Sequence, residues 1–142
     1  MSFREQFAGI ASQICEKGGV TIFLDYLCGK APIMTSLKVG HNMKVQCYDP
    51  KVERFKAAPL AAQMVFCALE KEELQDTDLA DMLVELDLLT GAVLFLAVGE
   101  SSRTPEEWIS LVVDRFELQT FQRVDGGFYM ILYPIVGKVL AS

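Results

Sequence analysis

Apolar residues recur along the chain with the spacings of alternating helices and strands. Four of them near the start share one face of a predicted helix, namely Phe3, Phe7, Ile10 and Ile14. The pair Gly18–Gly19 predicts the end of this helix, because glycine adopts the left-handed stop conformation at little cost. The next run, 20–26, is short, apolar and β-branched, so it predicts a strand buried on both faces.

The middle of the chain continues the alternation. A short helix is expected over 31–39, a strand over 43–49 that stops before Pro50, and a strand over 62–69. A stripe at i, i+3, i+4 and i+7 then predicts a helix, formed by Leu79, Met82, Leu83 and Leu86. Asp78 is its expected N-cap and Gly91 its expected stop.

The last third of the chain predicts a strand, a capped helix and a hairpin. The strand covers 92–98, and Thr104 with Glu107 forms a capping box around Pro105. Two strands, 116–124 and 127–135, are joined through Asp125-Gly126-Gly127, a hairpin turn signal. This order predicts an α/β fold, a Rossmann-like three-layer sandwich whose mostly parallel sheet ends in a C-terminal antiparallel hairpin.

Length and composition fit one folded unit. The 142 residues are 51% apolar and are expected to form a single domain, with an N-terminal helix in 1–19 and the core in 20–135. The net charge is −6, divided into +3 for residues 1–56 and −9 for residues 57–142. No basic run is present, which argues against a nucleic-acid partner.

The sequence also predicts where the protein resides. No apolar stretch reaches the roughly 20 residues that cross a bilayer, and the first residues lack a signal-peptide core, so a soluble cytoplasmic protein is expected. The four cysteines, Cys15, Cys28, Cys47 and Cys67, lack CxxC spacing and are interpreted as buried free thiols. No metal site is predicted.

The stretch TIFLDYLCGKAP (21–32) carries the most specific chemistry. An apolar strand runs into Asp25 and then into a turn with one glycine, Gly29. Two interpretations are open, a nucleotide-binding turn or a strand that merely ends in a bend. Asp49 ends the next predicted strand 20 residues after Gly29, a separation that suits a glycine turn and a ribose-binding carboxylate.

Several motifs together resemble class I S-adenosylmethionine-dependent methyltransferases, in particular small bacterial and phage members. FLDYLCGKA resembles the first motif of that family, and CYDP the end of its second strand. VFCALEKEEL resembles the strand and helix after the cofactor pocket, while RTPEEWISLVVDRFEL and the last hairpin resemble its closing third.

The resemblance implies a cofactor, a site and an activity. The cofactor is S-adenosylmethionine, and the residues at its site would be Asp25, Tyr26, Cys28, Gly29, Asp49 and Cys67. Asp25 and Gly29 would lie at its methionyl end and Asp49 at its ribose, while Glu70 is the weak candidate for a catalytic residue. The implied activity is methyl transfer to a small molecule.

Four positions depart from the family pattern. Leu27 stands where the family has glycine, and Ala31 where glycine is frequent. After the third strand, Ala68 replaces an acid and Lys71 a histidine. The alternative hypothesis is therefore a catalytically inactive binding or structural module of the same fold, as a homo-oligomer or with a protein partner.

Overall fold

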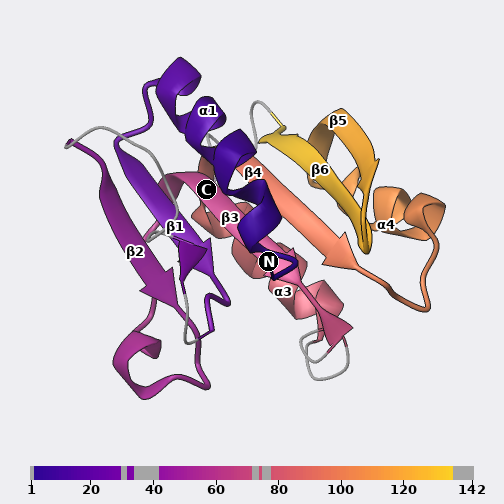
Figure 1. The fold of residues 1–142 in the computed structure, drawn as a ribbon, viewed down its shortest axis with the longest axis horizontal. Helices are drawn as coiled ribbons and strands as arrows, with labels where there is room; N and C mark the ends of the chain where they lie inside the picture. The colour runs from indigo at the N-terminus through magenta and orange to yellow at the C-terminus, as the bar shows by residue number, and fades with distance from the viewer. Residues whose placement is uncertain (1, 30–31, 34–41, 72–73, 75–77, 136–142) are drawn as a thin grey trace.

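Helices lie on both sides of one mixed sheet in the computed structural model, which describes residues 2–29, 32–33, 42–71, 74 and 78–135 (Figure 1). The six strands of this part have the order β2-β1-β3-β4-β6-β5. They are β1 Ile22–Tyr26, β2 Lys44–Tyr48, β3 Ala62–Leu69, β4 Thr90–Gly99, β5 Phe116–Val124 and β6 Gly127–Pro134. The helices are η1 Glu5–Phe7, α1 Ala8–Gly18, η3 Glu53–Phe55, α3 Leu79–Leu89 and α4 Pro105–Val112.

The strand directions confirm the predicted fold class. β1 pairs in parallel with both β2 and β3, and β3 pairs in parallel with β4. β6 is antiparallel to β4 and to β5, which forms the edge, so the C-terminal hairpin closes the sheet as expected. The two-residue turn between these strands places Gly126 at φ +85°, a conformation that glycine adopts without strain.

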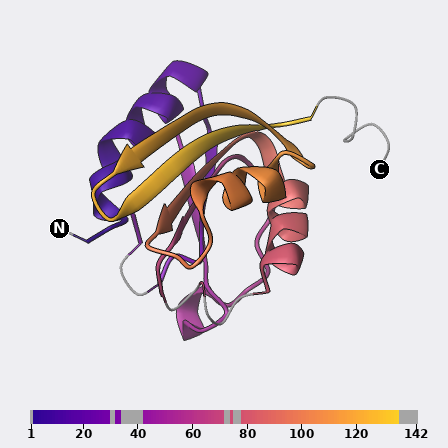
Figure 2. The same ribbon diagram turned by 90° about the vertical axis from the view of Figure 1, so that its right-hand side faces the viewer.

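The sheet separates two apolar cores, so the described part has three layers (Figure 2). On one face, Phe7, Ala11 and Cys15 pack from η1 and α1. Four rings cross the strands beneath them, with centroid separations of 6.4, 5.4 and 5.0 Å along the series Phe23, Phe66, Phe95 and Tyr129. The other face is covered by α3 and α4, with Trp108 fully buried.

Local signals explain most element ends. Gly19 caps α1 in the left-handed conformation, and the Asp78 side chain accepts a hydrogen bond from the N–H of Asp81 at the start of α3. Thr104 and Glu107 form the predicted capping box of α4. Each cap satisfies backbone groups that a helix end leaves unpaired.

The prediction that Gly91 stops the helix is wrong. α3 ends at Leu89, where the hydroxyl of Thr90 donates to the carbonyl of Leu86 at 2.6 Å. Gly91 lies instead inside β4, where a Cβ atom would come within 3.2 Å of the carbonyl oxygen of Ala62. Its small size therefore serves the close approach of two strands.

Two further findings bear on the sequence predictions. The helix expected over 31–39 lies outside the described residues, apart from positions 32 and 33. Within the described part, no helix has the length and apolar character that crossing a bilayer requires.

Candidate functional site

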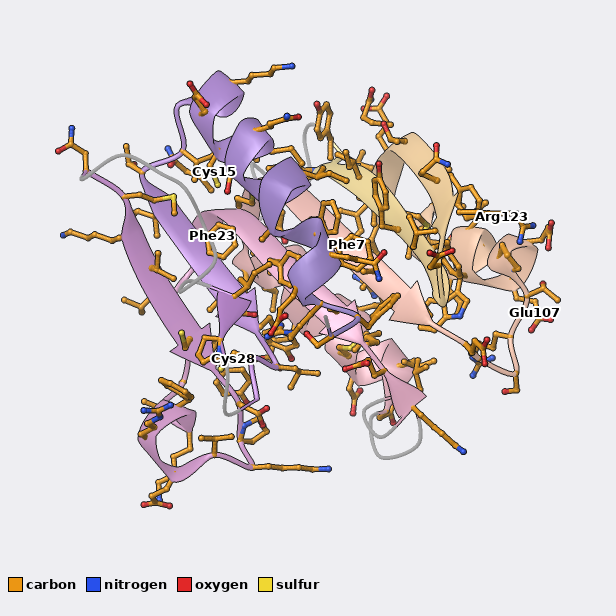
Figure 3. All side chains as sticks on the ribbon, in the orientation of Figure 1. Phe7, Cys15, Phe23, Cys28, Glu107 and Arg123 are labelled. Atoms are coloured by element: carbon orange, nitrogen blue, oxygen red, sulfur yellow. The ribbon has the colours of Figure 1, made fainter. Side chains whose placement is uncertain are left out.

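The carboxyl ends of β1 and β2 meet where the strand order reverses. The chain leaves β1, forms β2 on one side, and then forms β3 on the other side of β1. In open α/β sheets this switch point is where ligands bind, because the loops on either side of it turn away in opposite directions. Cys28, labelled in Figure 3, follows the end of β1 at this edge.

Asp49 and the glycine turn are joined directly. The N–H of Gly29 donates to Oδ2 of Asp49 at 2.9 Å, and the N–H of Lys51 donates to Oδ1 at 3.0 Å. The N–H of Cys28 donates to the carbonyl of Tyr48 at 3.1 Å, so the turn continues the pairing of the two strands. Residues 20 positions apart therefore form one structural unit.

Gly29 adopts φ +67°, and among the described residues, its chain neighbours aside, no atom lies within 4 Å of the position that its Cβ would occupy. Glycine is the residue that takes this left-handed conformation without a steric cost. No described residue fills the space beside the turn, which leaves room there for a ligand to approach the backbone closely.

Asp25 is fully buried beneath the turn. Its Oδ1 accepts a hydrogen bond from the guanidinium of Arg4 at 2.7 Å, and its Oδ2 accepts from the N–H of Ile33 at 2.8 Å. Arg4 also donates to the carbonyl of Cys28 at 2.8 Å and lies 5.4 Å from the ring centre of Phe66. Arg4 thus connects the N-terminal segment to both ends of the turn.

The charge state of Asp25 reflects this burial. Loss of solvation raises its pKa from 3.8 to about 6, although the Arg4 guanidinium and the Ile33 N–H both lower it. A carboxylate this deeply buried is retained only with such partners, because an unpaired buried charge is strongly destabilising.

Leu27 lies inside the turn with φ +57°, and it is the one non-glycine residue with a positive φ in the described part. A bulky L-residue in this region carries about 1–2 kcal/mol of strain. Its side chain is partly buried and packs against the α3 and α4 core, as do those of Tyr48 and Leu74. Leucine therefore fills part of the space that glycine would leave open.

Tyr26 packs into the core on the α3 side of the sheet. Its hydroxyl donates to Glu85 of α3 at 2.9 Å, and burial together with the nearby Glu85 raises its pKa. Cys67 is fully buried within β3, and Cys28 is 1% exposed with a pKa that burial raises to about 12. Of the six predicted site residues, Gly29 and Asp49 are thus joined by a hydrogen bond at the turn. Asp25 is connected to the same turn through Arg4.

Glu70 is exposed directly after β3, at the carboxyl edge where the sequence placed it. Next to it a cleft of about 1010 Å³ opens beyond the ends of β3 and β4. Its walls combine charged, hydroxyl and apolar side chains: Lys71, Leu74, Asp78, Leu79, Ala80, Glu100, Ser101, Ser102, Arg103, Glu107 and Leu111. Ala68, by contrast, is buried in β3 and lies against the α1 core.

Arg4 is the residue that sequence reasoning missed. It lies 21 positions from Asp25, in a segment that carried only a helical pattern of apolar residues. One signal was available, because a buried carboxylate predicted at the end of an apolar strand requires a cationic or N–H partner.

Comparison with solved structures identifies the fold. A SAM-dependent methyltransferase from Aquifex aeolicus matches 87% of this chain and 88% of its own, with a TM-score of 0.59 and 16% identity. The magnesium protoporphyrin IX methyltransferase from Synechocystis PCC 6803, solved with bound SAM, matches 92% and 78%, with a TM-score of 0.64 and 12% identity. The 16S rRNA methylase ArmA matches 91% and 82%, with a TM-score of 0.61 and 13% identity.

The chain therefore has the class I methyltransferase fold, as the sequence motifs predicted. No protein-family model matches the sequence, and no curated protein matches it significantly.

Proposed function

We propose that the chain binds S-adenosylmethionine at the carboxyl ends of β1 and β2 and transfers its methyl group to a small molecule. The observation that supports this most is the bond from the Gly29 N–H to Asp49, because it brings a glycine turn and a carboxylate together at the switch point. The fold is shared with proteins named as SAM-dependent methyltransferases, one of them solved with SAM bound.

The residues at this edge suit such a cofactor. The open space beside Gly29 admits the methionyl end of the molecule, and Asp25 with Arg4 fixes the turn from below. A carboxylate has about four lone-pair sites, and Asp49 accepts one backbone N–H on each oxygen, so acceptor capacity is left for ribose hydroxyls.

The chain's own contribution to methyl transfer would be positioning. When bound, S-adenosylmethionine supplies an electrophilic methyl group on its sulfonium. Holding this group in line with an acceptor removes most of the entropic barrier of such a reaction. Glu70 is the candidate proton acceptor, because it is exposed at the carboxyl end of β3 and directly precedes Lys71, which lines the cleft.

Charge favours a small acceptor over a nucleic acid. The C-terminal half carries −9, and the cleft walls place Asp78, Glu100 and Glu107 against Lys71 and Arg103. A phosphate backbone would be repelled by this balance. Structures of the same fold include both a porphyrin methyltransferase and an rRNA methylase, so the fold itself does not decide the acceptor.

We extend the proposal to the cellular compartment, the number of domains and a partner chain. We place the protein in a reducing, cytoplasmic compartment of a bacterium or phage-infected cell, because its four cysteines are free thiols. We treat residues 1–142 as one domain, since a single sheet extends through the described part. A second copy or a protein partner would complete the acceptor site.

A catalytically inactive module of the same fold is the second candidate function. The specific observation in its favour is Leu27, which is held in a strained conformation and occupies space beside the turn. Ala68 and Lys71, at positions where the resemblance implies an acid and a histidine, fit this alternative as well.

Calorimetry with S-adenosylhomocysteine distinguishes the two candidates. We expect micromolar binding to the wild-type protein, and a loss of about 1–3 kcal/mol in Asp49→Ala, because the ligand loses a hydrogen-bond acceptor. Glu117→Ala, an exposed acid on β5, is the matched control and should bind as the wild type does. The absence of heat at millimolar ligand would support the inactive module, and an unchanged affinity in Asp49→Ala would refute the ribose assignment.

A further inference from the structure

Helix α3 has more apolar residues than the sheet can cover. Its inner face buries Met82, Leu83, Leu86 and Leu89. A second apolar stripe is exposed and has the i, i+4, i+8 spacing of one helix face. It consists of Ala80, Val84 and Leu88. Leu88 is 74% exposed and Val84 is 39% exposed.

The polar residues of α3 do not shield this stripe. Glu85 accepts the hydrogen bond from the hydroxyl of Tyr26, and Asp87 accepts one from the guanidinium of Arg115 at 3.2 Å. Both carboxylates are partly buried in these contacts. A helix that is apolar on two faces is typical of one that is covered on both.

A groove runs beside the stripe, between α3 and α4. A cavity of about 410 Å³ is lined by Ala80 and Val84 from α3 and by Leu111 from α4. Ala80 and Leu111 line both this cavity and the larger cleft beyond the ends of β3 and β4. Figure 2 shows the two helices on the same side of the sheet. Residues of both helices line the cavity.

The borders of this groove are acidic. Asp81 flanks it on α3, and Asp114 flanks it just beyond the end of α4. Glu107 is exposed one turn before Leu111 and lines the neighbouring larger cleft, at the outer side of the molecule in Figure 3. The one cation on the walls of the smaller cavity, Arg115, pairs with Asp87.

We propose that this groove between α3 and α4 is a docking site for a helix of another protein, one that presents an apolar stripe flanked by lysine and arginine. Insertion of an amphipathic helix into an apolar groove is a recurring recognition mode, in which anchors at helical spacing fill the groove. The acidic borders select a basic partner and exclude an acidic one. The proposal does not depend on cofactor binding at Gly29 and Asp49.

Two synthetic peptides test the proposal on the full chain. Both are helical, about 15 residues long, with leucines along one face; one carries lysine and its twin carries glutamate at the flanking positions. In amide NMR titrations, we expect the lysine peptide to shift resonances of α3 and α4 with micromolar affinity that weakens with salt. The glutamate twin should not bind.

Matched variants locate the contact. Leu88→Gln should weaken the lysine peptide by about tenfold, the effect of losing one buried leucine. Leu60→Gln is the control, because Leu60 is 73% exposed just before β3 and does not line the groove. Both positions are at the surface, so both variants should fold.

Three results would overturn the proposal. One is the absence of lysine-peptide binding, and another is equal binding by the wild type and Leu88→Gln. The third is a dimer of the protein alone, seen in sedimentation, that Leu88→Gln dissociates, since a second copy would then cover the groove.

Discussion

At the scale of single residues, Leu27 links the strain in the turn to ligand entry. It holds φ +57° while its side chain packs against the core beside the open space at Gly29. A strained residue at a proposed binding turn is maintained by the packing around it, so glycine at this position would relieve both the strain and the crowding at the turn.

We predict that Leu27→Gly binds S-adenosylhomocysteine about tenfold more tightly than the wild type. The variant removes a side chain that crowds the turn and adopts the positive φ without strain. Leu27→Ala, which opens the space but keeps the strained backbone, should gain less. Calorimetry measures both affinities, and a weaker or unchanged affinity in Leu27→Gly would mean that the ligand does not pass Leu27.

Asp25 predicts a pH dependence of stability. Its pKa is raised from 3.8 to about 6 by burial, so between these values the folded protein holds a proton that the unfolded chain has released. The free energy of unfolding therefore falls as pH rises from about 4 to about 6, by about 3 kcal/mol from this group.

Comparison with Asp25→Asn isolates this effect, because asparagine does not titrate. Urea unfolding at several pH values should show the stability of the wild type decreasing relative to the variant across that window. If the two curves run parallel from pH 4 to 7, Asp25 stays ionised throughout, and the Arg4 pair outweighs the cost of burial.

The sequence could predict only part of the candidate site, for physical reasons. Asp25, Gly29 and Asp49 are visible because a strand, a turn and the next strand carry local patterns. The contacts of Arg4 with Asp25 and of Tyr26 with Glu85 join residues 21 and 59 positions apart. Such contacts depend on how the layers pack, which no local pattern encodes.

At the scale of elements, the sequence predicts the ends of helices where a side chain or a glycine caps them. Asp78, Thr104 and Gly19 act within one turn of the helix they delimit, so sequence alone locates them. Gly91 was misread because its role is steric and involves Ala62 of the neighbouring strand. A glycine in sequence does not show whether backbone conformation or close packing requires it.

Gly127 provides the test of close packing between strands. A Cβ at this position would collide with the carbonyl oxygen of Val98, where β6 pairs with β4. We therefore predict that Gly127→Ala destabilises the protein by at least about 3 kcal/mol, since backbone must shift to accept it. Chemical denaturation measures the loss.

Gly9→Ala is the matched control, because nothing lies within 4 Å of its Cβ position in helix α1. Alanine has the higher helix propensity, so this variant should be more stable by up to about 1 kcal/mol. If the two substitutions changed the free energy of unfolding equally, β6 would not approach β4 as closely as described.

At the scale of the whole molecule, the fold separates two surfaces, the proposed cofactor site and the proposed docking groove. The switch point between β1 and β3 lies beside the positively charged first part of the chain, whereas the α3–α4 groove belongs to the acidic second part. A basic partner is therefore better tolerated at the second surface than at the first.

The central claim is that the turn carrying Gly29, held by Asp49, binds an adenosyl ligand. Amide NMR of the 142-residue protein with S-adenosylhomocysteine tests it most directly, because the N–H groups of Gly29 and Lys51 both bond Asp49. We predict that these two resonances shift and saturate at micromolar ligand. Unchanged Gly29 and Lys51 resonances at millimolar ligand would contradict the claim.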